Sequence, residues 1–429
     1  MNFNALHAIG AFRRTRRLQR KLRSREDIAA WREQRLRRFL DKVAPRAQFY
    51  RSARGARLSS LPILDKKRVL ENFHLLNVAG VTASEAWEAI EKGERTHGLV
   101  AGYSTGTSGN RGLFLVSDKE RFTWLGVLLA KTLTDFPWRK YRVALALPAS
   151  SALYESASET GRIALRFFDL RRGIRAWREE LEEFAPDTIV APPKVLRALA
   201  EDPRQLRPKH LFSGAEVLDP LDRAAIEAVF RVTVRELYQA TEGLFAVACP
   251  KGTLHLCEDI VAFEWEEPVA GSGLVSPIVT DFTRSTQIMA RYRMNDLLQL
   301  SPDRCSCGSP LQPVQSILGR SDDVFMFAAA DGHQLLITPD VVRNAVVDAD
   351  RRIEDFRVTQ TSATQVEVRL PEELGLELAG KAAAAVLQTL RGAGAAEIDV
   401  TAAVGVSTPY DKKLRRVHRD WSPAAEDKR

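Results

Sequence analysis

The stretch Tyr103-Ser104-Thr105-Gly106-Thr107-Ser108-Gly109-Asn110-Arg111-Gly112 is the most informative part of this sequence. Seven of its ten residues are Ser, Thr or Gly, and no bulky apolar side chain follows Tyr103. Glycine lets the backbone approach oxygen atoms closely, and successive N–H groups in a turn bind anions. The stretch predicts either a phosphate-binding loop or a solvated turn, and the motifs downstream favour the loop.

The residues on either side of this loop predict a connection between two strands. Residues 98–102 form a short apolar segment before it, and 112–116 are typical of a strand after it. The Walker phosphate loop instead needs Gly-Lys-Ser/Thr at the start of a helix, a pattern that this sequence lacks.

Composition predicts a globular protein with at least two lobes, since 429 residues exceed the usual range of one domain. The sequence contains 45% hydrophobic and 28% charged residues. It has no apolar run long enough for a transmembrane helix, and its N-terminus is unlike a secretory signal. Four cysteines are too few for a disulfide scaffold, so we expect a reducing, cytoplasmic location.

Positive charge is concentrated at the N-terminus. Residues 1–51 contain 15 Lys/Arg and 4 Asp/Glu, a net charge of +11, whereas the whole chain carries +8. Two interpretations are open: a solvated helix face, or a patch for an anionic partner such as a carrier protein, a membrane surface or nucleic acid. No zinc-finger, RNP or helix-turn-helix signature supports nucleic-acid binding.

The order of elements predicts an α/β protein. Residues 26–43 repeat apolar positions at helical spacing, and Pro45 ends that helix. Strands at 142–147, 188–191, 210–212 and 234–238 then alternate with helices at 122–134, 175–184, 193–200 and 221–230. This alternation predicts a parallel sheet covered by helices.

Shorter strands follow, at 254–256, 261–265, 274–280 and 297–300, and predict an antiparallel sheet or small barrel. Beyond Gly319, a strand-rich α+β lobe is predicted from strands at 324–327, 334–337, 356–361 and 365–370 with helices at 339–348 and 376–390. We therefore expect a domain over 1–319, whose basic helical segment is 1–51, and a smaller mobile domain over 320–429.

Four further motifs lie at strand ends, where ligands bind in open α/β sheets. They are Ser213-Gly214-Ala215-Glu216, Glu236-Leu237-Tyr238-Gln239-Ala240-Thr241-Glu242-Gly243, Arg291-Tyr292-Arg293-Met294-Asn295-Asp296 and Gly319-Arg320-Ser321-Asp322-Asp323. Taken singly, each carboxylate could equally belong to a surface ion pair.

In this order, the motifs resemble those of the adenylate-forming superfamily of acyl-CoA and aryl-CoA ligases. Within it, the chain looks most like the phenylacetate–CoA ligase branch and related coenzyme-F420 synthetases. The resemblance extends from about Arg35 to Arg416 and includes Leu61-Pro62-Ile63-Leu64-Asp65-Lys66.

The resemblance implies roles for the motif residues. Tyr238 is expected to stack on adenine, Thr241 to hold the α-phosphate and Glu242 to ligate Mg²⁺, a cation that prefers oxygen ligands. Asp296 is expected to accept hydrogen bonds from the ribose hydroxyls, and Arg320 to contact ribose or phosphate. Asp322 is expected to be the hinge between two half-reactions. Other residues expected to bind ATP are Ser104, Thr105, Gly106, Thr107, Ser108 and Gly109 at its phosphates, and Gly214, Ala215 and Glu216 at adenine.

The resemblance also implies a catalytic lysine near the C-terminus. The segment Tyr410-Asp411-Lys412-Lys413-Leu414-Arg415-Arg416-Val417 fits the family's ending best when Lys413 is that residue. A lysine here would stabilise charge that builds as pyrophosphate leaves. Lys412 is the adjacent alternative, and a solvated basic tail is another.

The chain departs from the family pattern at three places. Gly109 is followed by Asn110-Arg111-Gly112, where the family's loop usually continues Gly-Lys-Pro-Thr/Lys. Gln239 replaces a common glycine, and Met294-Asn295 replaces Thr-Gly before Asp296. These changes indicate a divergent subfamily with an unusual substrate or acceptor.

The cysteines lie in two places: Cys249 and Cys257 flank His255, and Cys305-Ser306-Cys307 lies in a turn. Cys and His are the usual ligands of structural zinc. The resemblance implies a structural Zn²⁺ held by Cys249, His255, Cys305 and Cys307. Cys257 could substitute for one of them, and ordinary thiols are the alternative interpretation.

The sequence therefore predicts an ATP- and Mg²⁺-dependent ligase that activates a carboxylic acid as its acyl-adenylate, with CoA as the default acceptor. A carrier-protein thiol, an amine or an alcohol are alternative acceptors. AMP transfer to a hydroxyl and a non-catalytic nucleotide-binding homologue remain further alternatives. Apolar residues at 147–168 and after Gly243, including Tyr154, Phe167, Phe168, Leu244 and Phe245, favour an aryl or medium-sized apolar acid. The sequence leaves oligomerisation open.

Overall fold

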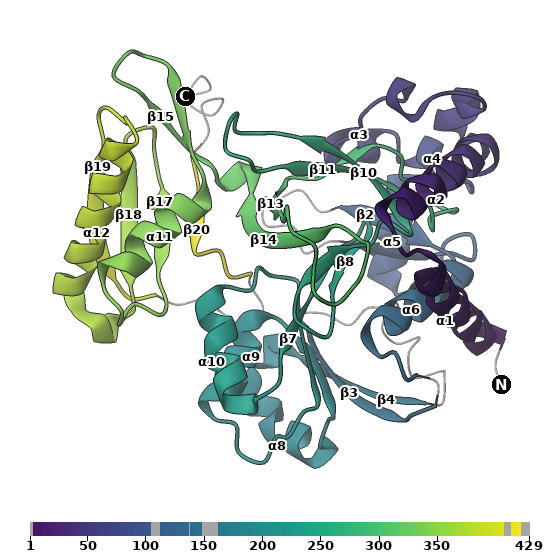
Figure 1. Ribbon diagram of the computed structural model, residues 1–429, viewed down its shortest axis with the longest axis horizontal. Coiled ribbons are helices and arrows are strands. Elements are labelled where there is room, and N and C mark those ends of the chain that lie inside the picture. Colours follow the sequence, from purple (N-terminus) through teal and green to yellow (C-terminus); the bar gives the residue numbers. More distant parts are fainter. Residues whose placement is uncertain (1–2, 104–111, 137, 148–161, 407–412, 422–429) are drawn as a thin grey trace. The chain divides into compact units, whose positions relative to one another are not determined.

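The computed structural model describes residues 3–103, 112–136, 138–147, 162–406 and 413–421 (Figure 1). Packing divides the chain into two compact units. The first comprises Met1–Glu266, Pro277–Met294 and Leu300–Gln315, and the second comprises Glu267–Ser276, Asn295–Gln299 and Ser316–Arg429. The boundary predicted from the sequence, between 319 and 320, falls at the end of strand β14 (Pro313–Arg320).

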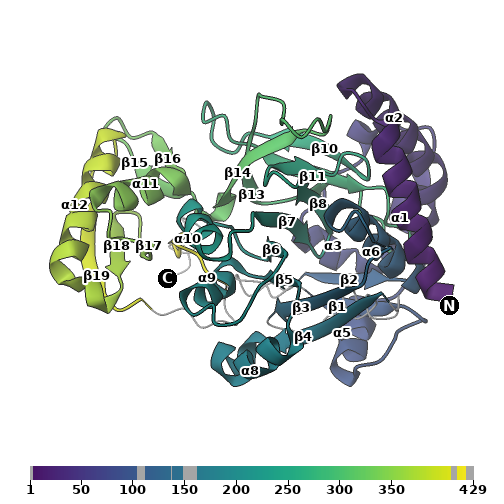
Figure 2. The same ribbon diagram turned by 60° about the horizontal axis from the view of Figure 1, so that its bottom comes forward.

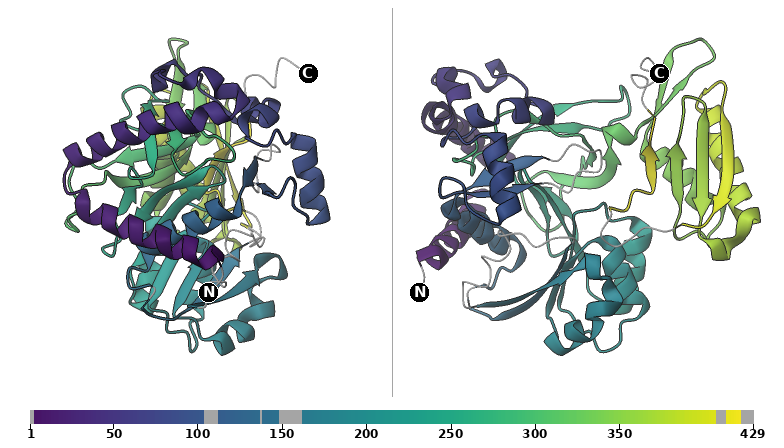
Figure 3. Two further views of the ribbon diagram at one scale, coloured as in Figure 1. Left: turned by 90° about the vertical axis from the view of Figure 1, so that its right-hand side faces the viewer. Right: turned by 180° about the vertical axis from the view of Figure 1, so that it is seen from behind.

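The first unit begins with helices that lie on its outside (Figure 3). Helix α2 starts at a capping box, in which the Ser24 side chain accepts from the Asp27 N–H and the Asp27 carboxylate accepts from the Ser24 N–H. The helix predicted over 26–43 is this helix, and its last turn, Phe39–Val43, is a π-helix. The helices of this region are α1 (Phe3–Lys21), α2 (Arg25–Arg38), α3 (Lys66–Glu71), α4 (Phe73–Leu76) and α5 (Ala83–Lys92).

The main sheet of the first unit confirms the predicted β-α alternation. Its strands follow the order β9-β8-β7-β6-β5-β3-β4, and Pro313 and Val314 of β14 pair with β9. The neighbouring strands from β4 through β3, β5 and β6 to β7 all pair parallel. The pairs β7–β8 and β8–β9 are antiparallel. The strands are β3 (Tyr141–Leu147), β4 (Ile163–Asp169), β5 (Thr188–Ala191), β6 (His210–Gly214), β7 (Val234–Ala240), β8 (Gly243–Ala248) and β9 (Leu254–Leu256).

Helices cover both faces of this sheet (Figure 1). Helix α6 (Asp118–Thr132) packs its apolar side chains on residues of β3, β6, β7 and β8. The helices of the other face are α8 (Ile174–Phe184), α9 (Pro193–Glu201) and α10 (Pro220–Phe230). Three strands of this sheet were not predicted: β4, β8 and β14. A loop was expected after Gly243, where β8 lies. Leu244 and Phe245 are consequently buried in the sheet.

Two small sheets complete the first unit. Strands β1 (Val100–Tyr103) and β2 (Leu113–Val116) pair antiparallel, so residues 104–111 connect two strands as predicted. The other sheet has the order β10-β11-β12, and β11 and β12 pair antiparallel as expected for this region. Its strands are β10 (Val261–Glu266), β11 (Ser276–Asp281) and β12 (Tyr292–Arg293).

The second unit is the predicted α+β lobe. Its main sheet has the order β19-β18-β17-β20, and helices α11 (Pro339–Ala349) and α12 (Gly375–Gly392) lie side by side on it (Figure 2). A core of buried aliphatic and aromatic side chains fills the space between helices and sheet. Strand β13 (Asp296–Leu300) belongs to this unit except for its last residue. The other strands of the unit are β15 (Phe325–Ala328), β16 (Gln334–Ile337), β17 (Arg357–Gln360), β18 (Gln365–Leu370), β19 (Asp399–Val404) and β20 (Val417–Arg419).

Candidate active site

Thr241 and Glu242 form the tip of a hairpin between β7 and β8. Ala240 pairs with Gly243, so only these two residues make the turn. The Thr241 hydroxyl donates to the Glu242 carboxylate at 2.9 Å. Gly243 follows the turn, and a Cβ there would lie 2.9 Å from Oδ2 of the buried Asp281, so a larger residue would displace that side chain. The turn therefore presents a hydroxyl and a carboxylate at a fixed position.

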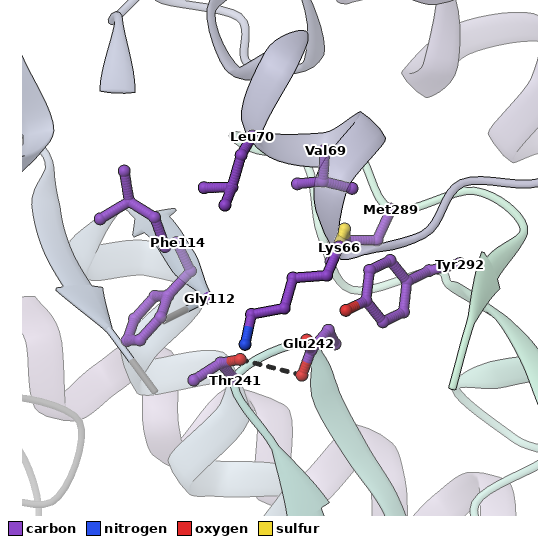
Figure 4. A pocket seen from close by; sticks show the side chains of 10 residues that line it. Lys66, Val69, Leu70, Gly112, Phe114, Thr241, Glu242, Met289 and Tyr292 are labelled. Atoms are coloured by element: carbon purple, nitrogen blue, oxygen red, sulfur yellow. Dashed lines mark hydrogen bonds between the residues drawn. The ribbon is translucent and has the colours of Figure 1, made fainter. Parts of the chain in front are cut away.

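This turn lines a pocket within the first unit (Figure 4). The Lys66 side chain extends toward Thr241 and Glu242, and Tyr292 lies beside it. Gly112, the residue that follows the Ser/Thr/Gly loop, is part of the same wall. The remaining lining residues are apolar: Val69, Leu70, Leu113, Phe114 and Met289. An ammonium, a carboxylate and a hydroxyl thus meet beside an apolar surface.

Lys66 is a site residue to which the sequence analysis gave no role. Asp65 caps helix α3 by accepting from the Arg68 N–H at 2.8 Å, which makes Lys66 the first helical residue. The segment before the helix is held to β12, since the Leu64 N–H donates to Arg291 O and the Arg293 N–H donates to Leu64 O. The N-cap aspartate followed by lysine was the available signal, but it does not reveal where the side chain points.

A polar loop, residues 284–287, contacts the hairpin turn and holds it in place. Arg284 donates to the Thr241 carbonyl, its side chain is mostly buried, and its guanidinium lies 5.9 Å from the centre of the Phe114 ring. The Glu120 carboxylate accepts from the N–H groups of Ser285 and Thr286 at 2.6 and 2.8 Å. Gln287 accepts from the Leu115 N–H at 3.0 Å, which joins the same loop to β2.

The carboxylates of this region have shifted pKa values. Burial acts to raise the pKa of Glu120, but hydrogen bonds from Ser117, Thr286 and two backbone N–H groups outweigh it, and the pKa is lowered. Burial raises the pKa of Asp281, although the nearby Arg284 opposes the shift. The Glu120 carboxylate is therefore held as an anion, and it fixes residues 284–287, the loop that contacts Thr241, by accepting hydrogen bonds from their backbone.

The predicted adenine-binding residues lie at the end of β6 and on β7. Ala215 has a left-handed backbone with φ of 68°, which is unusual for a residue with a side chain. Such local strain is concentrated at functional sites. Glu216 forms a buried ion pair with Lys194 at 3.2 Å. The Tyr238 ring packs on Phe245, with 5.4 Å between their centres.

In the second unit, the structure brings together three predicted site residues. Arg320 Nε lies 4.0 Å from Oδ1 of Asp296. Asn295 donates to the Asp322 carboxylate at 2.7 Å, and Ser321 N–H donates to Asn295 O at 2.7 Å. The motif ending in Asp296 is therefore held against the Arg320–Asp322 segment.

Lys413 lies four residues before β20, which pairs parallel with β17. The neighbouring Arg415 forms an ion pair with the buried Asp323.

Lys412 and Tyr154 lie outside the described residues, as do the loop residues Ser104, Thr105, Gly106, Thr107, Ser108 and Gly109. Of the residues expected to contact the acid, Phe168 is buried against Trp177, with 5.3 Å between the rings.

The four residues predicted to hold zinc form one cluster in the first unit. The ligand atoms of Cys249, His255, Cys305 and Cys307 all lie within 4.8 Å of one another. The Cys249 and Cys305 sulfurs are 4.0 Å apart, and the Cys307 sulfur is 3.4 Å from His255 Nε2. His255 Nδ1 lies 3.1 Å from the Leu311 carbonyl, which leaves Nε2 directed at the cluster. Three thiols and one imidazole fit a closed structural zinc site.

Cys257 is outside this group. It is buried in the core beneath α6, and burial raises the pKa of its thiol to about 12. The nearby Lys131 ammonium donates to both carboxylate oxygens of Asp259 at 2.8 Å. Of the two ligand sets left open by the sequence, the structure favours the one without Cys257.

Comparisons with known proteins agree with the resemblance inferred from the motifs. A phenylacetate–coenzyme A ligase from Thermus thermophilus is 26% identical over 186 residues, which are 38% of this chain and 42% of the relative. The chain thus matches less than half of that relative's length. No family model matches the sequence.

Among solved structures, 2-hydroxyisobutyryl-CoA ligase in its postadenylation state has a TM-score of 0.67. The two sequences are 18% identical, and the match covers 95% of this chain and 92% of that one. An anthranilate CoA ligase bound to anthranoyl-AMP has a TM-score of 0.51 at 14% identity, over 74% of this chain and 66% of that one. The fold is that of the adenylate-forming ligases, and the predicted α/β class is confirmed.

Proposed function

We propose that this protein is an ATP-dependent ligase that activates a carboxylic acid as an acyl-adenylate and transfers the acyl group to CoA. The observation that carries this proposal is the pocket in which Lys66 approaches the Thr241–Glu242 turn beside the β1–β2 hairpin. A cation, a hydroxyl and a carboxylate in one pocket suit a polyphosphate and its metal ion. The similarity to solved acyl-adenylate-forming enzymes supports the same conclusion.

In the first step, a carboxylate oxygen of the acid attacks the α-phosphorus of ATP. An O–P bond forms, the bond to the β-phosphate oxygen breaks, and pyrophosphate leaves. We assign stabilisation of the phosphate charge to Thr241, Lys66 and Lys413. Glu242 is the residue that would hold Mg²⁺, which supplies positive charge to the phosphates when it is bound.

In the second step, the CoA thiolate attacks the acyl carbon, a C–S bond forms, and AMP leaves with its electron pair. The chemistry of the pocket gives no contact specific to CoA. A carrier-protein thiol, an amine or an alcohol therefore remain alternative acceptors, and the apolar lining favours an apolar or aryl acid. The Cys249–His255–Cys305–Cys307 cluster would hold a structural Zn²⁺ that takes no part in either step.

The test is a screen of the purified protein against a panel of carboxylic acids, with ATP, Mg²⁺, and CoA present or absent. Pyrophosphate release that depends on the acid supports adenylation. Loss of free CoA thiol with the same acid identifies the acceptor. AMP joined covalently to a product hydroxyl would show AMP transfer instead, and ATP binding without any pyrophosphate release across the panel would favour a non-catalytic homologue.

A further inference from the structure

Helix α1 is fixed to the first unit by one face. Ala5, Ala8, Phe12 and Thr15 are buried on this face, and the helix packs along α6. The contact is so close that a Cβ on Gly126 of α6 would lie 2.2 Å from Ala8 O. Only glycine permits that approach. The opposite face of α1 is therefore displayed in a constant orientation, on the outside of the unit (Figure 3).

The displayed face is basic without any acidic residue. The helix contains six cations and no Asp or Glu over its whole length. Arg13, Arg17 and Arg20 recur at helical spacing and are exposed, as are Arg14 and Lys21. Among the residues that the structure describes, none of the six cations forms an ion pair. Like charges at this spacing repel one another, so the face is suited to an anionic partner.

Two large apolar side chains accompany this charge. Leu6 is 50% exposed and lies seven residues before Arg13, which places it on the same face. Trp138 is 77% exposed, and its ring contacts Phe12 edge-on with 6.4 Å between centres. Trp138 is followed by the exposed cations Arg139 and Lys140, of which Arg139 pairs with Asp135 at 3.8 Å.

We propose that the basic face of α1, together with Leu6 and Trp138, binds the surface of an anionic lipid bilayer. We call this set of residues the α1 face. Between Leu6 and Lys21 it extends about 22 Å, at about 1.5 Å per residue. An extended, rigid row of cations can contact many lipid headgroups at once. Exposed Trp and Leu side chains beside cations are typical of residues at a membrane interface.

This surface is distinct from the pocket and independent of the proposed ligase activity. Among the helices of the described chain, none is long and apolar enough to cross a membrane. The proposed attachment through exposed cations depends on the salt concentration, because ions screen exposed charges.

The experiment is co-sedimentation of the full-length protein with vesicles of phosphatidylcholine alone or with about 30% phosphatidylglycerol. We expect binding to the anionic vesicles only, and release when NaCl is raised from about 0.05 to about 0.5 M. Equal binding to neutral vesicles, or no binding to anionic ones by folded protein, would overturn the proposal. Binding to an acidic protein or to RNA in place of the anionic vesicles would also overturn it.

Charge reversal tests whether the α1 face is responsible. The triple variant Arg13→Glu, Arg17→Glu and Arg20→Glu should bind anionic vesicles at least about tenfold more weakly. A matched control with the same change in net charge, Lys209→Glu, Arg351→Glu and Arg391→Glu, should bind within about twofold of the unaltered protein. Trp138→Ala, a single exposed change, should weaken binding about threefold without affecting the fold. Equal binding by the triple variant and its control would reject the assignment of this face.

Discussion

At the scale of single residues, Lys66 is the clearest addition that the structure makes to the candidate site. It reaches the pocket from the first residue of α3, and its neighbour Lys67 points elsewhere, near Glu71. Replacing Lys66 by Met should slow acid-dependent pyrophosphate release by about 100-fold, because one charged contact to the phosphates is lost. Lys67→Met is the matched control and should retain activity. Equal rates for the two variants would remove Lys66 from the site.

Lys413 is the second residue-scale prediction. Lys413→Ala should lower the rate of adenylate formation by about 100- to 1000-fold while ATP still binds, because its contacts strengthen mainly in the transition state. Rapid-quench measurement of acyl-adenylate, with ATP binding measured separately, distinguishes these effects. If Lys412→Ala has the large effect and Lys413→Ala has none, the catalytic lysine is the neighbouring residue.

At the scale of elements, the loop behind Thr241 depends on the buried Glu120 carboxylate. Glu120→Gln should destabilise the protein by about 2–4 kcal/mol, because an amide N–H group replaces an acceptor of buried backbone donors. The same capping-box exchange at Glu85 should have a small effect, because this carboxylate is exposed and its one pairing outside the capping box, with the exposed His97 at 3.8 Å, is long. Thermal unfolding of both variants measures the difference.

The pH dependence of this contribution follows from the sign of the shift. The pKa of Glu120 is lowered below its ordinary value of 4.5 in the folded protein. The stabilisation is therefore fully present above pH 4.5 and is lost as the pH falls through the lower folded-state pKa. The gap in unfolding temperature between wild type and Glu120→Gln should narrow only in that acidic range. A gap that already closes near pH 6 would contradict this account.

The loop that carries Cys305 and Cys307 is also an element-scale feature. Purified protein should contain about one zinc per chain, and Cys305→Ser should lose it together with roughly 5–10 °C of thermal stability. Cys257→Ala should retain the metal, because that thiol lies outside the cluster. The zinc content of protein prepared without chelator tests this prediction. If that protein contains no zinc, the cysteines are ordinary thiols and the cluster is not a metal site.

At the scale of the whole molecule, Asp322 is the predicted hinge of the second unit. Proline fixes φ near −65° and removes an N–H group. Asp322→Pro should therefore impair the two half-reactions unequally, and we expect adenylation to be spared and acyl transfer to be blocked. Single-turnover assays that follow acyl-adenylate and final product separately provide the measurement. Equal loss of both steps in a folded variant would argue against alternation about this residue.

The sequence by itself determined the features that depend on local patterns. Apolar spacing predicted α6 and α8 and the strands β3, β5, β6 and β7, because helix and strand periodicities are properties of neighbouring residues. It placed a loop between strands at 104–111. The set of ligands Cys249, His255, Cys305 and Cys307 came from the resemblance to the ligase family, and the structure brings these four residues together. The sequence analysis missed β4, β8, β12, β14, β19 and β20, because these strands are fixed by pairing with the rest of their sheets.

Tertiary structure decided the features that join distant residues. Lys66 meets Thr241 and Glu242 only because α3 and the β7–β8 hairpin pack together. Glu120 supports the loop at Ser285 across 165 positions of sequence, and Cys257 is turned into the core although it is only two residues from His255. Local propensities cannot encode these contacts, because each depends on the packing free energy of the whole unit. The identity of the pocket residues was therefore settled by the fold.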